Sequence, residues 1–164
     1  MSMAAENYRN TQVMTASPMD LVIMLYGELN TFSSDLCASI LAKAKAALAP
    51  GACLVAEPHT FAAVKGIGQG SNTWDKHETG LFSEDPHLCL TENRWFADEA
   101  TALQSFYVLD AASGRVEHYR STTKAWTNEE YEKLLAEAGF DEVVCRDDWP
   151  SHSEHLMLWT GRRT

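Results

Sequence analysis

The chain has 164 residues, which is enough for one domain with a buried core, and 45% of them are apolar. Its formal net charge of −10 at pH 7 argues against the basic surface that a nucleic-acid partner requires, so we expect no nucleic acid to bind. The start, MSMAAENYRN, lacks the apolar core of a signal peptide, and no later apolar run is long enough to span a membrane. We therefore expect a cytoplasmic protein without a membrane partner.

Residues 1–19 are a polar N-terminal segment without clear periodicity, and the apolar run DLVIMLY follows at residues 20–26. A short, continuous apolar run is typical of a strand that is buried on both faces, as in a parallel sheet. The first predicted element is therefore a buried strand.

A helix follows this strand after a short loop, GELNTFSS. Ser33 or Ser34 can cap its N-terminus, and apolar residues then recur at helical spacing until APG at residues 49–51 ends it. ACLVAE, at residues 52–57, is a second apolar run and a second predicted strand. Residues 20–57 thus form a βαβ unit with parallel strands.

Residues 58–126 begin as a loop-rich stretch with a short predicted helix at residues 61–65, and then change to a period of two. That alternation predicts an antiparallel β-meander. Its three predicted strands are LCLTENRWF, ATALQSFYVLD and RVEHYRSTTKAW.

The last segment, residues 127–164, begins with a helix whose capping box is formed by Thr127 and Glu130. Two further strands are predicted at residues 140–148 and 155–163. We treat the whole chain, 1–164, as one domain built from these four segments.

The glycines of VKGIGQGSNTW alternate as they do in nucleotide-binding loops. Such a loop needs a crossover helix after it, and the stretch that follows carries Gly80 and Pro86 without apolar residues at helical spacing. We interpret GIGQG as a flexible connection.

Polar side chains follow both strands of the βαβ unit, at the edge where ligands bind in open α/β sheets. Tyr26, Glu28 and Asn30 come after the first strand, and Glu57 and His59 come after the second. A histidine at that edge is a candidate general base. The alternative is an ordinary set of loop residues that interact only with solvent and with the loop itself.

Metal and thiol chemistry are not expected. His77 and His87, with carboxylates between them, lack the helical spacing of an HExxH site, so a solvated acidic loop is the preferred interpretation. The four cysteines contain no CxxC pair, which favours free thiols in a reducing compartment over structural zinc or a disulfide framework.

The order of these elements resembles the class I S-adenosylmethionine-dependent methyltransferases. The resemblance rests on DLVIMLYGELNTF, ALAPGACLVAEPHTF and WTNEEYEKLLAEAGF, together with the closing strand pair. It implies an α/β fold: a partial Rossmann-like sheet made of the family's last four strands, with the β-meander inserted as a lid over the substrate. It also implies that the final strand, at residues 155–163, runs antiparallel between the strands at residues 52–57 and 140–148.

The resemblance further implies S-adenosylmethionine as cofactor and a small-molecule substrate. Tyr26 and Gly27 would border the cofactor, while His59 and Glu28 would be catalytic. The expected substrate-binding residues are Asn30, Glu57 and Trp74.

The family's glycine-rich cofactor loop has no counterpart in this sequence. We therefore weigh an alternative, in which the chain is a truncated, non-catalytic remnant that serves as a binding or self-association module. Without its next neighbour, the strand at residues 20–26 would have an open apolar edge, so we expect homodimers to form through it.

Overall fold

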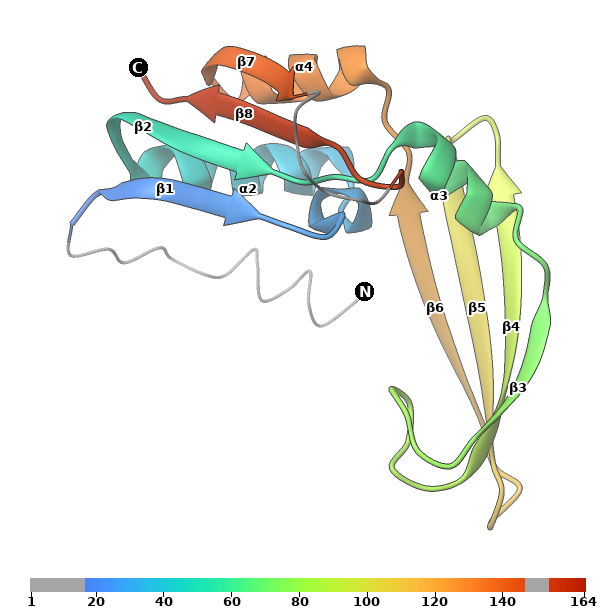
Figure 1. Cartoon of the computed structure of the whole chain (residues 1–164). Coiled ribbons are helices and arrows are strands. Elements are labelled where there is room, and N and C mark those ends of the chain that lie inside the picture. The colour runs from blue at the N-terminus through green and yellow to red at the C-terminus, as the bar shows by residue number, and fades with distance from the viewer. Residues whose placement is uncertain (1–16, 147–153) are drawn as a thin grey trace. The chain divides into compact units, whose positions relative to one another are not determined.

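The computed structural model describes residues 17–146 and 154–164 and divides the chain into two compact units (Figure 1). The first, which we call the sheet–helix unit, comprises Met1–Ala63 and Trp126–Thr164. The second, which we call the meander unit, comprises Val64–Ala125. Within the described residues, no helix is both long enough and apolar enough to cross a membrane.

The sheet–helix unit contains four strands: β1 (Met19–Met24), β2 (Leu48–Ala56), β7 (Asp141–Arg146) and β8 (Leu158–Arg162). Their order in the sheet is β1-β2-β8-β7. β1 and β2 are parallel, whereas β8 is antiparallel to both of its neighbours. This confirms the predicted βαβ unit and the predicted place of the last strand. The parts of the two closing predictions that fall on residues 147–153 lie outside the described residues.

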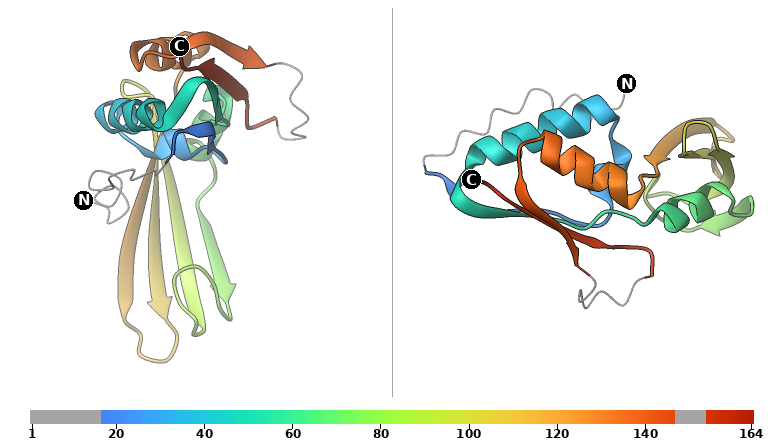
Figure 2. Two further views of the ribbon diagram at one scale, coloured as in Figure 1. Left: turned by 90° about the vertical axis from the view of Figure 1, so that its left-hand side faces the viewer. Right: turned by 90° about the horizontal axis from the view of Figure 1, so that it is seen from above.

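Two helices cover one face of this sheet, as Figure 2 shows from above. In α2 (Ser34–Ala47), the Ser33 hydroxyl accepts a hydrogen bond from the Leu36 amide at 3.4 Å. In α4 (Asn128–Glu137), Thr127 and Glu130 form the predicted capping box. The apolar sides of both helices pack on β1, β2 and β8 to form the core.

The end of α2 differs from the prediction. The helix ends at Ala47, so the APG stretch does not end a helix but lies inside β2. Gly51 has a φ of 80°, and the pairing register between β1 and β2 is irregular at this point. Pro50 and Gly51 thus bend the start of a longer strand, because a proline and a left-handed residue interrupt regular pairing.

The other face of this sheet carries no helix within the described residues. Leu21 and Ile23 of β1 point to that face and are 46% and 54% exposed, while Val22 and Met24 point into the core. β1 is also the end strand of the described sheet. Its outward face is therefore apolar and open, so the prediction of a strand buried on both faces is wrong for β1: only one of its faces is covered within the described residues.

The meander unit is a four-stranded antiparallel sheet of β3 (Thr73–His77), β4 (His87–Phe96), β5 (Thr101–Asp110) and β6 (Val116–Lys124), in that order. The last three are the predicted meander. β3 was not predicted, because every residue in it is exposed and its sequence shows no apolar alternation.

The expectation that GIGQG is a flexible connection is wrong for its first part. Helix α3 (Phe61–Gly68), which spans the boundary between the two units, contains both Gly66 and Gly68. A Cβ on Gly68 would lie 3.0 Å from the Arg94 carbonyl oxygen and from the Trp95 Cα. Gly68 therefore permits close contact between the helix end and the sheet, rather than flexibility.

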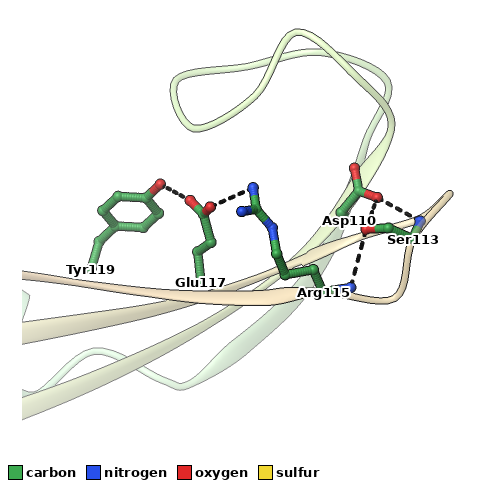
Figure 3. A network of polar contacts seen from close by, with 5 residues as sticks. All are labelled: Asp110, Ser113, Arg115, Glu117 and Tyr119. Carbon is green, nitrogen blue, oxygen red and sulfur yellow. Dashed lines mark hydrogen bonds and ion pairs between the residues drawn. The ribbon is translucent and has the colours of Figure 1, made fainter.

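The turn between β5 and β6 is ordered by polar contacts (Figure 3). The Asp110 carboxylate accepts hydrogen bonds from the amide and the hydroxyl of Ser113, at 2.6 and 2.5 Å. Arg115 forms an ion pair with Glu117 at 2.6 Å, and Glu117 also accepts a hydrogen bond from the Tyr119 hydroxyl. The Ser113 hydrogen bonds hold the pKa of Asp110 below its ordinary value of 3.8.

Candidate functional site

The ends of β1 and β2 are joined by the carboxylate and backbone of Glu57. Its Oε2 accepts a hydrogen bond from the Tyr26 amide at 3.1 Å, and its carbonyl accepts one from the Gly27 amide at 2.8 Å. Tyr26 and Gly27 have φ values of 55° and 72°, so the chain turns through two successive left-handed residues. For tyrosine this conformation costs about 1–2 kcal/mol, which the buried Glu57 helps to offset.

The backbone of His59 is held by a closed set of three hydrogen bonds. The His59 amide donates to Asn30 Oδ1 at 2.8 Å, and Asn30 Nδ2 donates to the Tyr131 hydroxyl at 2.7 Å. That hydroxyl donates to the His59 carbonyl at 3.0 Å. Asn30 and Tyr131 are 0% and 1% exposed, so water does not compete for these bonds.

The imidazole of His59 lies against Gly27. A Cβ at residue 27 would overlap the His59 ring at Cδ2 and Nε2, so glycine is needed there. On its other side, Nδ1 lies 3.3 Å from the His155 carbonyl oxygen, which can only accept a hydrogen bond. This contact favours the tautomer with a proton on Nδ1, so that the lone pair is on Nε2, beside Gly27.

Tyr131 is the residue that the sequence analysis did not assign to this site, because it falls in the apolar stripe of α4. Burial raises the pKa of its hydroxyl, so the group stays neutral and can donate to His59. A buried tyrosine hydroxyl needs a hydrogen-bond partner, and that need was the only feature of the sequence that could have indicated a role for Tyr131 beyond the core. The sequence offered no means of choosing Asn30 and His59 as its partners.

The short helix η1 (Glu28–Thr31), which carries Asn30, is fixed by a buried thiol. Cys37 Sγ lies 3.2 Å from the Leu29 carbonyl, to which it donates, and burial raises the Cys37 pKa to about 12. The thiol therefore stays protonated at neutral pH and acts as a small packing group with a weak donor. All four cysteines are free thiols.

The structure thus brings Tyr26, Gly27, Asn30, Glu57 and His59 together at one edge of the sheet, with Glu28 partly exposed beside them at the start of η1. The Tyr26 side chain is 81% exposed. Trp74 belongs to the meander unit, where it lies on β3 and is 69% exposed. In the described part of the chain, no three His, Cys, Asp or Glu side chains are grouped so that they can hold a metal ion.

The sheet order β1-β2-β8-β7, with β8 antiparallel between its neighbours, defines the carboxyl-terminal part of the class I methyltransferase fold. Known structures with this fold include the sugar N-methyltransferase KedS8 from Streptoalloteichus, with a TM-score of 0.66 and 19% identity over 95% of this chain. The CcbJ methyltransferase from Streptomyces caelestis has a TM-score of 0.65 and 16% identity over 96%. CalS10, an amino pentose methyltransferase from Micromonospora echinaspora, has a TM-score of 0.59 and 22% identity over 96%.

This chain covers 60% of the KedS8 chain and 62% of each of the CcbJ and CalS10 chains. At these identities the likeness establishes the fold alone. No protein-family model matches the chain, and no curated protein matches it in sequence.

Proposed function

We propose that this chain acts in methyl transfer from S-adenosylmethionine to a small molecule, with His59 as the base that accepts a proton from the substrate. The observation that carries the proposal is the arrangement of His59: its backbone is fixed on both sides, and its Nδ1 faces a carbonyl that leaves Nε2 as the basic nitrogen. The fold supports the choice of reaction, because KedS8 is a sugar N-methyltransferase and CalS10 is an amino pentose methyltransferase.

The described residues fit one end of such a cofactor. The exposed Tyr26 ring lies after the end of β1, and an aromatic face attracts a cationic group such as a sulfonium. The amides of Tyr26 and Gly27 are already bound by Glu57, so they cannot serve as donors to a ligand. Gly27 would act by admitting the His59 ring, and Tyr26 would border the cofactor.

When bound, the cofactor would supply a methyl group on a positively charged sulfur. The chain's own part would be to hold His59 Nε2 where a substrate hydroxyl or amine gives up its proton. Asn30, with both ends of its amide bound inside the protein, would position His59 rather than touch the substrate. Glu57 would fix the turn that carries Tyr26, and Glu28 is the carboxylate nearest to solvent at this edge.

Two measurements test the proposal. Calorimetry with S-adenosylmethionine and with S-adenosylhomocysteine should show saturable binding to the chain. Because general-base catalysis contributes about 100-fold or more, His59→Gln should lower kcat by about that factor while cofactor binding persists. His77→Gln, at an exposed position of the meander unit, is the matched control and should keep its activity. Equal kcat values for His59→Gln and the unaltered chain would remove His59 from the proposal.

The second candidate function is self-association without catalysis. The observation in its favour is β1, an end strand of the described sheet on which Leu21 and Ile23 are about half exposed. Antiparallel pairing of β1 with a second copy would satisfy the free backbone edge of β1, place Leu21 and Ile23 beside the same side chains of the partner strand, and form a closed two-fold dimer.

Sedimentation should then show a dimer at micromolar concentration that Ile23→Lys converts to a monomer. Leu81→Lys is the matched control, because Leu81 is 93% exposed in the meander unit and should not affect the dimer. A chain that sediments as a monomer contradicts this candidate, whereas the absence of cofactor binding contradicts the first.

A further inference from the structure

A polar cavity of about 210 Å³ lies within the meander unit, and none of the residues used above for methyl transfer lines it. Three of its lining residues form one row across three strands. Glu92 of β4 is paired with Ser105 of β5, and Ser105 is paired with Arg120 of β6. Paired residues project to the same face of a sheet, so their side chains converge on this cavity.

Two guanidinium groups line the cavity with a single carboxylate. Arg94 lies two residues after Glu92 on β4 and therefore projects to the same face. Among the residues that the structure describes, no ion pair joins Glu92 to Arg94 or Arg120. Within residues 17–146 and 154–164, Arg120 donates a single weak hydrogen bond, from Nε to His118 Nε2 at 3.4 Å.

Most of the guanidinium donors thus remain available, since each arginine carries five N–H groups. The cavity has a local charge of about +1 in a chain whose net charge is −10. Arginine side chains bind carboxylate and phosphate groups in a planar, two-point manner. Glu92 and the Ser105 hydroxyl offer acceptors beside them, which suit a hydroxyl group on the same ligand.

We propose that this cavity binds a small organic oxyanion that also carries a hydroxyl group. Its oxyanion lies between Arg94 and Arg120, and its hydroxyl donates to Glu92. The cavity holds the equivalent of roughly seven waters at about 30 Å³ each, below the range of about 300–1,000 Å³ for drug-sized ligands. The ligand, or the part of it that enters, therefore has the size of a phosphorylated three-carbon polyol.

Titration of the full, ¹⁵N-labelled chain with glycerol 3-phosphate tests this site directly. The backbone amides of Glu92, Ser105 and Arg120 should shift in a saturable way, and glycerol alone should leave them unchanged. Arg120→Ala should weaken binding by about tenfold or more. Arg115→Ala removes the same charge from the tip of the same hairpin, outside the cavity, and should leave the affinity unchanged.

The Glu92→Gln variant distinguishes two kinds of site. One binds an oxyanion together with a hydroxyl group that donates to Glu92, and the other attracts any anion. Without the carboxylate, inorganic phosphate should bind several-fold more tightly, because a like charge is removed. The advantage of glycerol 3-phosphate over phosphate should fall, because its hydroxyl loses a charged acceptor. Equal weakening by Arg115→Ala and Arg120→Ala, or no saturable shift at the three amides, would overturn the proposal.

Discussion

Removal of a single hydroxyl, in Tyr131→Phe, should destabilise the sheet–helix unit and release His59. The change deletes the 2.7 Å bond from Asn30 and the 3.0 Å bond to the His59 carbonyl. The Asn30 amide is buried and the His59 carbonyl is part-buried, and the loss of each bond costs about 1–3 kcal/mol, the part-buried one at the lower end. Part of this cost is offset, because phenylalanine has no hydroxyl to bury. We therefore expect the free energy of unfolding to fall by about 2–3 kcal/mol.

Urea denaturation, followed by circular dichroism, measures the loss of stability. Hydrogen exchange at the His59 amide gives a local measure, because that amide donates to Asn30 and should exchange faster once Asn30 loses the Tyr131 hydroxyl. Tyr119→Phe is the matched control: its hydroxyl binds Glu117 at the exposed hairpin tip, and we expect a change within about 0.5 kcal/mol. If Tyr131→Phe and Tyr119→Phe have the same stability, the three hydrogen bonds around His59 do not stabilise its backbone.

Two further predictions concern single residues. Gly27→Ala should lower the free energy of unfolding by more than Gly114→Ala. Both glycines have a φ of 72°, but a Cβ would overlap a side chain, that of His59, only at residue 27 of the two. Equal losses of stability in urea denaturation would contradict the close contact between Gly27 and the His59 ring. Ser113→Ala should raise the Asp110 pKa toward 3.8 in an NMR titration. The folded-state pKa of Asp110 lies below the unfolded-state pKa, so the ionised carboxylate stabilises the hairpin. This stabilisation is full above pH 3.8 and is lost as the pH falls through the folded-state pKa. An unchanged Asp110 pKa in Ser113→Ala would show that the Ser113 hydrogen bonds do not lower it.

The sequence predicted the sheet–helix unit well, because its elements have both periodicity and punctuation. The apolar runs of β1 and β2 and the capping box at Thr127 are local signals, and each element includes its signal, although β2 begins at Leu48, four residues before its predicted start. β3 carries no such signal, since all of its residues are exposed. Gly68 was misinterpreted because glycine is needed there for close packing of α3 on β4 and β5. That contact is not encoded in any local sequence pattern.

The candidate site was predicted in part. The end of a parallel strand is a general location for ligands, so Tyr26, Glu57 and His59 could be chosen from their positions alone. The partnership of Asn30 with Tyr131 joins residues 101 positions apart and depends on the packing of α4. The cavity beside Arg120 depends on the register of the paired strands. The alternation of apolar residues does not specify that register, because both faces of this sheet are partly exposed.

The way in which residue 59 is held has a consequence for its replacement. Asn30 and Tyr131 bind the amide and the carbonyl of His59 and make no use of its imidazole. Any residue with a backbone N–H therefore keeps both bonds, and only proline would break one. We therefore expect another acid or base at position 59 to keep both backbone bonds and to lose only the contacts of the ring itself, with Gly27 and with the His155 carbonyl, so that the chemistry at this edge of the sheet can change by a single substitution.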